Sequence, residues 1–423
     1  SIVREIRQGI GKNRRCNLMA FTRKQREFLD NANHRWNIKQ GATRSGKTYL
    51  DYFVIPKRIR QVAGKDGLVV ILGNTKGTLQ RNVIEPLQNI YGEQLVSNIR
   101  SDNTANMFGE KVYCLGADKI NQVNRIRGAS IKYCYGDEVA TWHEEVFTML
   151  KSRLDKPYSK FDGTLNPESP HHWLKKFLES DADIYCQSYT IDDNPTLDPS
   201  FVANLKQEYA GTVYYDRYIL GLWKSAEGVI YTQIADRPQD YVIDVAPPIM
   251  FATIGVDFGG NGSATTFNLT GYTSGMNEVI TLKEYYRKGI MTPKELEKDF
   301  VTFVKECKRF FIVTDAYCDS AEQTLIRGLK VAVAKEGIGL SIHNARKGEI
   351  NNRIRFFCRL HGIGKHKIMR ECKYTLEAFQ TAVWDAKYVT KDVRLDDGIY
   401  NIDSLDAQEY AVEPYMNQII DIW

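Results

Sequence analysis

The sequence predicts an α/β protein of two domains, each built around its own sheet. The chain has 423 residues, which exceeds one compact core and fits two domains of ordinary size. In the first half, short apolar runs alternate with helix-like stretches, which is typical of a mostly parallel sheet covered by helices. In the second half, three consecutive strand-like runs precede a new alternation of helices and strands.

The N-terminal domain is predicted to span 1–224. Its strand candidates are Trp36–Gln40, Leu68–Leu72, Lys111–Leu115, Ile131–Tyr135, Lys160–Leu165 and Asp183–Tyr189. Helical stretches lie between most of these strands, at 46–60, 76–90, 143–153 and 170–179, and a helical subdomain follows at about 199–224. Residues 225–250 contain Pro238, Pro247 and Pro248 and are predicted to form a linker.

The C-terminal domain is predicted to span 251–423. It opens with strands at Ile254–Asp257, Thr265–Tyr272 and Glu278–Tyr286, and a hairpin turn at Thr273–Asn277 joins the last two. The elements predicted after them are a helix from Pro293 to Cys307, a strand at Phe310–Thr314, a helix at 320–336, a strand at 339–343 and a helix at 349–361. This order is that of a ribonuclease-H-like domain.

The composition excludes two classes of protein. A hydrophobic content of 43% and a charged content of 26% exclude a mainly disordered chain, and no apolar run reaches the roughly 20 residues of a membrane span. No apolar leader is visible near the N-terminus, so no secretory signal is expected. The eight Cys are scattered without a C-x-x-C pair, which predicts neither a zinc site nor a disulfide framework and fits a reducing cytosol.

The net charge of +5 is unevenly spread. Basic residues dominate Arg346–Lys373, and acidic residues dominate the chain from Asp385 onward. A basic stripe next to an acidic cluster suggests a polyanion partner near a metal site, while a solvated helix face explains the same pattern equally well.

Residues 41–48 carry the complete G-x-x-x-x-G-K-T pattern of a phosphate-binding loop. The segment follows a predicted strand and precedes the helical stretch Tyr49–Ile59, which is the context that this pattern requires. Its backbone amides are expected to curve around phosphates at the N-terminus of the helix. Lys47 is expected to reach the β- and γ-phosphates, and Thr48 to bind Mg²⁺. The residues of the loop are Gly41, Ala42, Thr43, Arg44, Ser45, Gly46, Lys47 and Thr48.

A pair of acids, Asp137 and Glu138, follows another predicted strand. In NTPases an acid at this position holds the metal, and an adjacent Glu orients and deprotonates the attacking water. Acids also favour helix N-termini, which is the alternative interpretation. The charge that develops on a transferred phosphoryl group calls for an arginine, for which Arg44, Arg125 and Arg127 are candidates, in the same subunit or from a neighbour.

Four acids of the second half predict a second metal site. Asp257 and Asp315 each follow a strand-like run, and Asp403 and Asp406 lie three residues apart, on one face of a helix. Carboxylate oxygens suit Mg²⁺ or Mn²⁺, and two such ions can cut a phosphodiester. Asp403 also fits a helix N-cap. Three histidines, His343, His361 and His366, either join such a site or lie on the surface.

Short motifs along nearly the whole chain resemble, in order and spacing, those of the large terminase subunit of tailed double-stranded DNA phages, the ATPase–nuclease that packages DNA. The motifs are the loop at 41–48, Arg125–Gly128, Tyr135–Glu138, Asp162–Pro167, His172–Leu174, Asp193–Pro195, Tyr215–Tyr218, Gly221–Trp223, Gly228–Tyr231, Asp257, Asp315 and Asp406–Ala411.

The resemblance implies roles for individual residues of the first domain. Lys47 and Thr48 bind ATP and Mg²⁺, Asp137 binds the metal, and Glu138 is the catalytic base. Thr164 and Asn166 match the coupling motif that senses the γ-phosphate. Gln25 matches a glutamine that contacts adenine. Arg44 and Arg127 match the positions of a trigger arginine.

In the second domain, the resemblance makes Asp257, Asp315 and Asp406 the acids that bind Mg²⁺ or Mn²⁺. Some relatives carry a histidine where Asp403 stands, so Asp403 is either a ligand or an auxiliary group.

The function implied is that of a viral packaging motor. ATP hydrolysis drives double-stranded DNA into the prohead, and a two-metal endonuclease cuts the concatemer. The implied partners are DNA, the portal protein and the small terminase subunit, with a monomer in solution, a ring on the portal and no membrane. The implied location is the host cytoplasm and not the mature virion. Two alternatives stay open: a helicase- or repair-type ATPase–nuclease, and a nucleotide-dependent DNA-binding scaffold without turnover.

Overall fold

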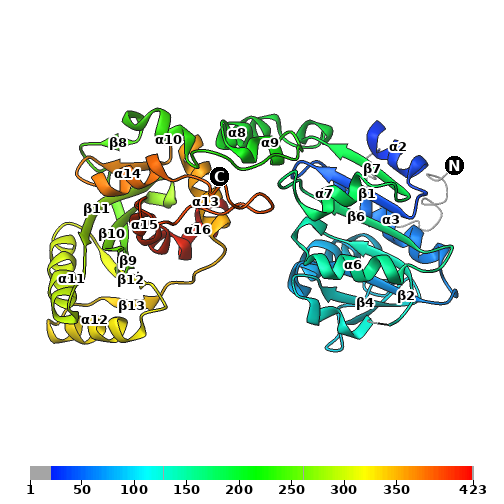
Figure 1. The fold of residues 1–423 in the computed structure, drawn as a ribbon, viewed down its shortest axis with the longest axis horizontal. Coiled ribbons are helices and arrows are strands. Elements are labelled where there is room, and N and C mark those ends of the chain that lie inside the picture. Colours follow the sequence, from blue (N-terminus) through cyan, green and yellow to red (C-terminus); the bar gives the residue numbers. More distant parts are fainter. Residues whose placement is uncertain (1–20, 127, 261, 422–423) are drawn as a thin grey trace. The chain divides into compact units, whose positions relative to one another are not determined.

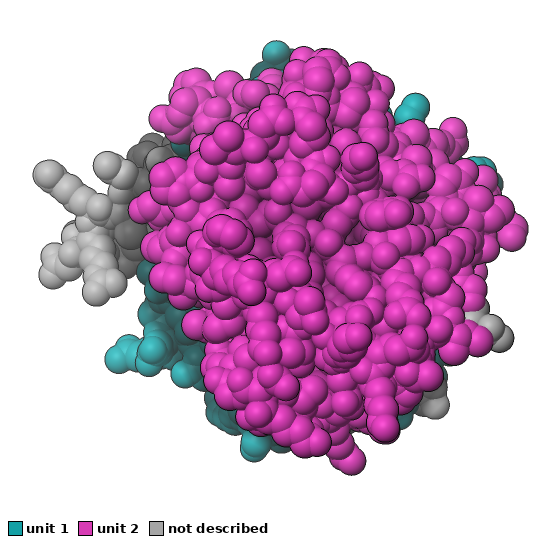
Figure 2. All heavy atoms as spheres, turned by 90° about the vertical axis from the view of Figure 1, so that its left-hand side faces the viewer, with its two compact units in different colours: residues 1–197, 216–224 teal, residues 198–215, 225–423 magenta. Residues whose placement is uncertain are grey.

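The computed structural model describes residues 21–126, 128–260 and 262–421. The chain divides into two compact units (Figure 2). Unit 1 runs to Leu197 and includes Asp216–Lys224, and unit 2 contains Asp198–Tyr215 and the chain from Ser225 onward. The predicted domain limits, 1–224, 225–250 and 251–423, remain a prediction.

Unit 1 is built on a seven-stranded sheet with helices on both faces (Figure 1). Its strands are, in spatial order, β3 (Thr104–Met107), β4 (Glu110–Gly116), β2 (Leu68–Gly73), β5 (Ile131–Gly136), β6 (Lys160–Leu165), β1 (Trp36–Gly41) and β7 (Ile184–Tyr189). Neighbouring strands run parallel, except for the antiparallel pair of β3 and β4. The six predicted strands are present, and β3 is additional.

The two faces of this sheet bury separate cores. Val69 and Ile71 of β2 pack with Ile55 of α3 (Lys47–Gln61), whereas Val70 and Leu72 pack in the core that contains Phe147 of α6 (Glu144–Arg153). Because successive side chains of a strand point to opposite faces, a strand covered on both sides is apolar throughout, as β2 is.

The predicted helix at 76–90 consists of three consecutive pieces, of which the middle one, η1, is π-helical. The helices of unit 1 are α2 (Arg23–Asn31), α3 (Lys47–Gln61), α4 (Lys76–Leu79), η1 (Gln80–Ile84), α5 (Glu85–Tyr91), η2 (Ile120–Ile126), η3 (Val139–Thr141), α6 (Glu144–Arg153), α7 (Trp173–Leu178) and η4 (Ile191–Asp193), and α9 (Val213–Tyr218) spans a boundary between the units.

Unit 2 has a second seven-stranded sheet, with a central antiparallel meander of β9, β10 and β11. Its strands are, in spatial order, β13 (Ser341–Asn344), β12 (Val313–Cys318), β9 (Ile249–Asp257), β10 (Ala264–Thr273), β11 (Val279–Lys288), β14 (His366–Met369) and β8 (Val242–Ile243). The outer pairs run parallel. This is the predicted ribonuclease-H-like order, with β14 and β8 added at one edge.

Helices cover both faces of this sheet as well (Figure 1). On one face, Phe300 of α11 (Pro293–Lys308) and Leu329 of α12 (Gln323–Lys335) pack with Phe267 of β10. On the other face, α15 (Asp403–Val412) lies on β9 and β10. The helices of unit 2 are α8 (Pro199–Tyr209), α10 (Thr232–Asp236), η5 (Pro238–Asp240), η6 (Ser274–Met276), α11 (Pro293–Lys308), α12 (Gln323–Lys335), α13 (Ile350–Gly362), α14 (Lys373–Thr381), α15 (Asp403–Val412), η7 (Glu413–Tyr415) and α16 (Met416–Asp421).

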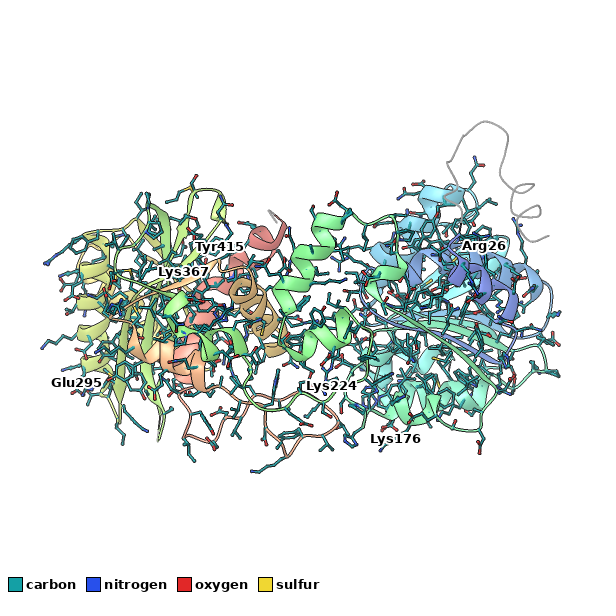
Figure 3. All side chains as sticks on the ribbon, turned by 90° about the horizontal axis from the view of Figure 1, so that it is seen from above. Arg26, Lys176, Lys224, Glu295, Lys367 and Tyr415 are labelled. Carbon is teal, nitrogen blue, oxygen red and sulfur yellow. The ribbon has the colours of Figure 1, made fainter. Side chains whose placement is uncertain are left out.

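Figure 3 shows the two ends of this layering in unit 2. Glu295, near the start of α11, and Tyr415, in η7 after α15, lie on opposite sides of the sheet.

In the described part of the chain, no helix is both long enough and apolar enough to cross a membrane.

Candidate active sites

The phosphate loop connects β1 to α3 at one edge of the unit 1 sheet. Its backbone has a positive φ at Gly41 (+137°), Arg44 (+53°) and Gly46 (+86°). At Gly41 a side chain is excluded as well, because a Cβ there would lie 2.0 Å from the carbonyl oxygen of Tyr189 in β7. The glycines of the motif are therefore required by the curvature of the loop.

Lys47 is the first residue of α3 and is 6% exposed. Its Nζ donates hydrogen bonds to the carbonyl oxygens of Gly41 (2.9 Å) and Ala42, and to Oδ1 of Asn166 (3.2 Å) just after β6. Burial lowers the pKa of Lys47 to about 7, while the negative charge of Glu138 acts in the opposite direction. A phosphate anion at this position would raise the pKa of Lys47 and favour the charged ammonium.

Strand β5 brings Asp137 and Glu138 to the same edge of the sheet. Asp137 is buried and accepts hydrogen bonds from Oγ1 of Thr164 (3.3 Å) and Nδ2 of Asn82 (3.4 Å). Burial raises the pKa of Asp137 above its usual value. Glu138 has a φ of +51°, which is costly for a residue with a side chain, so the backbone is strained at the predicted catalytic base.

These residues surround a cavity of about 550 Å³. Eight of its lining residues belong to the predicted site, and the sequence reasoning missed four. The predicted group is Thr43, Arg44, Lys47, Thr48, Asp137, Glu138, Thr164 and Asn166, and the missed group is Tyr52, Arg81, Asn82 and Leu165. The cavity thus joins the phosphate loop to the ends of β5 and β6.

Gln25 lies against the loop, outside the group that lines this cavity. Its Nε2 donates to the carbonyl oxygen of Gly46 (3.3 Å), and its Oε1 accepts from the backbone of Thr22 in the capping box of α2. Contact between Gln25 and adenine stays a prediction. Arg127 lies outside the described residues.

Two buried ion pairs fix α3 behind the phosphate loop. Lys39 of β1 and Asp51 of α3 are fully buried and lie 2.6 Å apart, and Arg58 of α3 pairs with Asp162 of β6 at 2.8 Å. Burial raises the pKa of Asp51 to about 6, while Lys39 acts in the opposite direction. The helix that begins at Lys47 is therefore tied by charge to the two strands beneath it.

In unit 2, Asp257 at the end of β9 is the centre of an acidic cluster. It is 8% exposed, and its pKa is raised well above the usual value, first by burial and then by the charges of Asp406, Asp403 and Asp319. α15, which carries Asp403 and Asp406, can approach β9 because Gly255 has no side chain: a Cβ there would lie 1.7 Å from the carbonyl oxygen of Ala407.

Asp315 does not lie with Asp257, which corrects the prediction. The strand expected to end at Thr314 continues to Cys318, and Asp315 pairs with Thr253 in its register. Thr253 is four residues before Asp257, roughly 13 Å along a strand. The carboxylate of Asp315 instead contacts Nε2 of His343 at 2.7 Å.

Asp319 takes the place that the prediction gave to Asp315. It directly follows β12, and its backbone N–H donates to the carbonyl oxygen of Val256 at 3.0 Å. Asp319 is thus held beside Asp257, at the true end of the strand.

The other acids of the cluster already have partners. Oδ2 of Asp403 accepts from the backbone N–H of Ala264 (2.6 Å), and Oδ1 of Asp406 pairs with Arg394 (2.5 Å). Asp403 begins α15 after its N-cap, Ile402, and its part in metal binding stays a prediction. Asp319 is paired with Lys347. In the described residues, no three His, Cys, Asp or Glu side chains are placed to hold one ion as they stand.

The remaining two histidines are core residues, not surface residues. His361 and His366 are buried, lie 3.0 Å apart through their ring nitrogens, and have pKa values lowered by burial. Among the described residues, neither His361 nor His366 forms a hydrogen bond or ion pair with the acids around Asp257.

Comparisons with known proteins identify this arrangement. Residues 40–235 match the family described as the terminase large subunit, T4likevirus-type, N-terminal. The structure of the large terminase of a thermophilic bacteriophage is similar over 93% of this chain and 98% of its own, with a TM-score of 0.79 and 24% identity. Residues 40–235, just under half of the chain, thus match the large terminase family, and the fold of nearly the whole chain is that of a large terminase.

Two further structures of that thermophilic phage's large terminase extend the comparison. The complex with ADP has a TM-score of 0.78 and 25% identity over 95% of this chain and 100% of that one. The complex with ATP-gamma-S has a TM-score of 0.76 and 25% identity over 92% and 98%. No curated protein matches the sequence. The predicted fold class is confirmed, and these matches support the predicted family.

The chain has functional candidates that sequence reasoning missed. Arg81 and Asn82 lie in η1, in the helical segment that follows β2, and the end of β2 adjoins β5 in the sheet. Their place after a central parallel strand was the available signal. Asp319 and Lys347 could be recognised only once the end of β12 at Cys318 was known, and the apolar run Phe310–Thr314 had predicted an earlier end for this strand.

Proposed function

We propose that the protein is a phage DNA-packaging motor. Its N-terminal half would hydrolyse ATP to move double-stranded DNA into a prohead, and its C-terminal half would cut concatemeric DNA. The observation that carries the proposal is the cavity in which Lys47, Asp137, Glu138 and Asn166 converge on a complete phosphate loop, in a chain that matches the large terminase family over residues 40–235.

The ATP site is supported by the chemistry of its donors. The loop amides and Lys47 would hold the β- and γ-phosphates, and the Thr48 hydroxyl and Asp137 carboxylate are hard oxygen ligands suited to Mg²⁺. Mg²⁺ would neutralise phosphate charge when bound. Glu138, beside Asp137 at the cavity wall, would orient and deprotonate the attacking water.

The coupling role proposed for Asn166 and Thr164 rests on their contacts. Asn166 bonds the ammonium of Lys47, and Thr164 bonds Asp137, so both sides of the phosphate site are connected to β6. The same strand carries Asp162, which pairs with Arg58 of α3. A change at the γ-phosphate would thus alter contacts of both β6 and α3. Arg44 and Arg81 are the cavity-lining arginines available to the transferred phosphoryl group.

The nuclease site is proposed at Asp257, Asp319 and Asp406, with Asp403 at its margin. The fit to divalent cations rests on the crowding of these acids: burial and mutual repulsion raise the pKa of Asp257, and two cationic side chains already pair with its neighbours. Mg²⁺ or Mn²⁺ would supply a nucleophilic water and stabilise the leaving oxygen. The carboxylates would position these ions against the DNA backbone.

The remaining partners follow from the proposed function. DNA would be held by its phosphates, so binding would be independent of sequence and weaken with salt. We propose the portal and the small terminase subunit as protein partners, a monomer in solution that forms a ring on the portal, and action in the host cytoplasm rather than in the mature virion.

Turnover of ATP by purified variants tests the motor. Lys47→Ala and Glu138→Gln should each abolish ATP hydrolysis, while Glu144→Gln, an exposed glutamate of α6 outside the cavity, should leave it intact. Hydrolysis that persists in both site variants would refute the motor. Unwinding of a forked duplex by the isolated chain, without portal and prohead, would favour a helicase instead.

A further inference from the structure

The loop between β13 and α13 holds Lys347 in an unusual conformation. Its φ is +50°, in the left-handed region that residues with side chains rarely adopt. The carboxylate of Glu413 fixes this backbone, because it accepts hydrogen bonds from the N–H groups of Lys347 (3.0 Å) and Gly348 (2.6 Å). A strained residue held by its surroundings is a common feature of functional sites.

This backbone directs the Lys347 ammonium into the acidic cluster. Its Nζ pairs with Oδ1 of Asp319 and lies 6.0 Å from the ring centre of Tyr410. Its positive charge is also near enough to Asp257 to act against the rise in the pKa of that carboxyl. Tyr410 belongs to α15, which carries Asp406, and Glu413 follows the same helix. One helix therefore positions both the acids and the lysine.

Lys347 differs from the other cation of the cluster. Arg394 is 4% exposed in its side chain and is held between Asp406 (2.5 Å) and Glu409 (2.6 Å). The side chain of Lys347 is 35% exposed, and that of Asp319 is 18% exposed. The lysine therefore faces the solvent side of the cluster, where a DNA backbone would arrive, and a long flexible side chain can exchange one anionic partner for another.

We propose that Lys347 is a catalytic residue of the nuclease. Its ammonium neutralises Asp319 in the metal-free protein and contacts a non-bridging oxygen of the scissile phosphodiester when metal and DNA are bound. This inference rests on the proposed nuclease function. A water oxygen forms the new bond to phosphorus and releases a proton to solvent, the bond to the leaving deoxyribose oxygen breaks, and that oxygen takes up a proton from solvent. Lys347 keeps its proton and offsets the charge that develops on phosphorus.

The first test measures binding of Mn²⁺ to the full chain by titration calorimetry, without DNA. Lys347→Ala should bind Mn²⁺ as tightly as the unchanged protein or up to about fivefold more tightly, because no ammonium competes for Asp319. A loss of Mn²⁺ binding in Lys347→Ala would overturn the proposal, since the lysine would then be needed to build the metal site. ATP hydrolysis and the melting temperature control for folding, and Lys347→Gln, which keeps a polar side chain, replaces Lys347→Ala if the latter melts early.

The second test measures plasmid cutting at saturating Mn²⁺ and DNA. Lys347→Ala should lower kcat about 100-fold, Lys347→Arg should recover part of it, and Lys335→Ala, at the exposed end of α12, should cut normally. If the unchanged protein does not cut, or Asp257→Asn cuts equally well, the nuclease itself is refuted, and this inference with it. If the nuclease is sound but Lys347→Ala keeps its kcat, or loses only KM, Lys347 is a counter-ion alone and the catalytic role is wrong.

Discussion

At the residue scale, the offset of four positions between Asp315 and Asp319 decides which of the two acids can join a metal site. Both acids belong to the chain around β12, and both have a polar partner, His343 for one and Lys347 for the other. Only Asp319 adjoins Val256, beside Asp257. By residue type alone, either carboxylate could serve as a metal ligand beside Asp257. The register of β12 against β9 decides between them, because it places only Asp319 next to Asp257.

We therefore predict opposite results for the two acids. Asp319→Asn should abolish Mn²⁺-dependent plasmid cutting, because it removes a charged carboxylate, the proposed metal ligand, next to Asp257, whereas Asp315→Asn should leave cutting within about threefold of the unchanged protein. Gel analysis of nicked and linear plasmid measures both, with ATP hydrolysis as the control for folding. Cutting lost in Asp315→Asn and kept in Asp319→Asn would contradict the assignment.

Arg81 offers a second prediction at this scale. It lines the nucleotide cavity from the π-helical turn η1, and its neighbour Asn82 contacts Asp137. Replacement by Ala should lower kcat for ATP about 100-fold with little change in nucleotide binding, because the guanidinium would act on charge that develops during transfer. Arg23→Ala, an exposed residue of α2, is the matched control. Equal turnover in both variants would exclude Arg81 from the reaction.

At the scale of elements, sequence reasoning succeeded where one signal decides and failed where tertiary register decides. The phosphate loop was predictable because glycine spacing, strand and helix occur together in 36–59. The end of β12 was not, because the apolar residues Phe310–Ile312 precede the strand, with Phe310 and Ile312 exposed. The helix at 76–90 was found, but not the π-turn that presents Arg81, since no local sequence rule marks it.

The anchoring of α3 yields a prediction at this scale. Asp51→Asn should destabilise unit 1 by about 3–5 kcal/mol, because Lys39 would be left buried without a counter-charge. Replacing both partners, Lys39→Met with Asp51→Leu, should recover much of this loss, because no buried charge remains. Denaturant unfolding followed by ATP-analogue binding measures the effect, and the exposed Asp66→Asn is the control. A double variant less stable than Asp51→Asn would contradict the argument.

At the scale of the whole molecule, each unit carries one proposed chemical site, and each site lies within its own unit. The nucleotide cavity is lined by unit 1 alone, and the acids, Lys347 and Arg394 all belong to unit 2. A packaging motor needs both activities, and the residues proposed for each activity belong to a single unit. The two activities should therefore be separable by mutation in the full chain.

The separation can be tested by packaging with two DNA substrates. Lys47→Ala should keep Mn²⁺-dependent cutting and fail to package any DNA, because it lacks the phosphate-binding ammonium. Asp257→Asn should hydrolyse ATP and fill proheads with linear DNA that is already cut to length, but should leave concatemers uncut and unreleased. DNase protection inside portal-bearing proheads measures packaging. If Asp257→Asn failed on pre-cut DNA while its ATP hydrolysis was normal, the acids of unit 2 would have a role in translocation, and the division of labour between the units would be wrong.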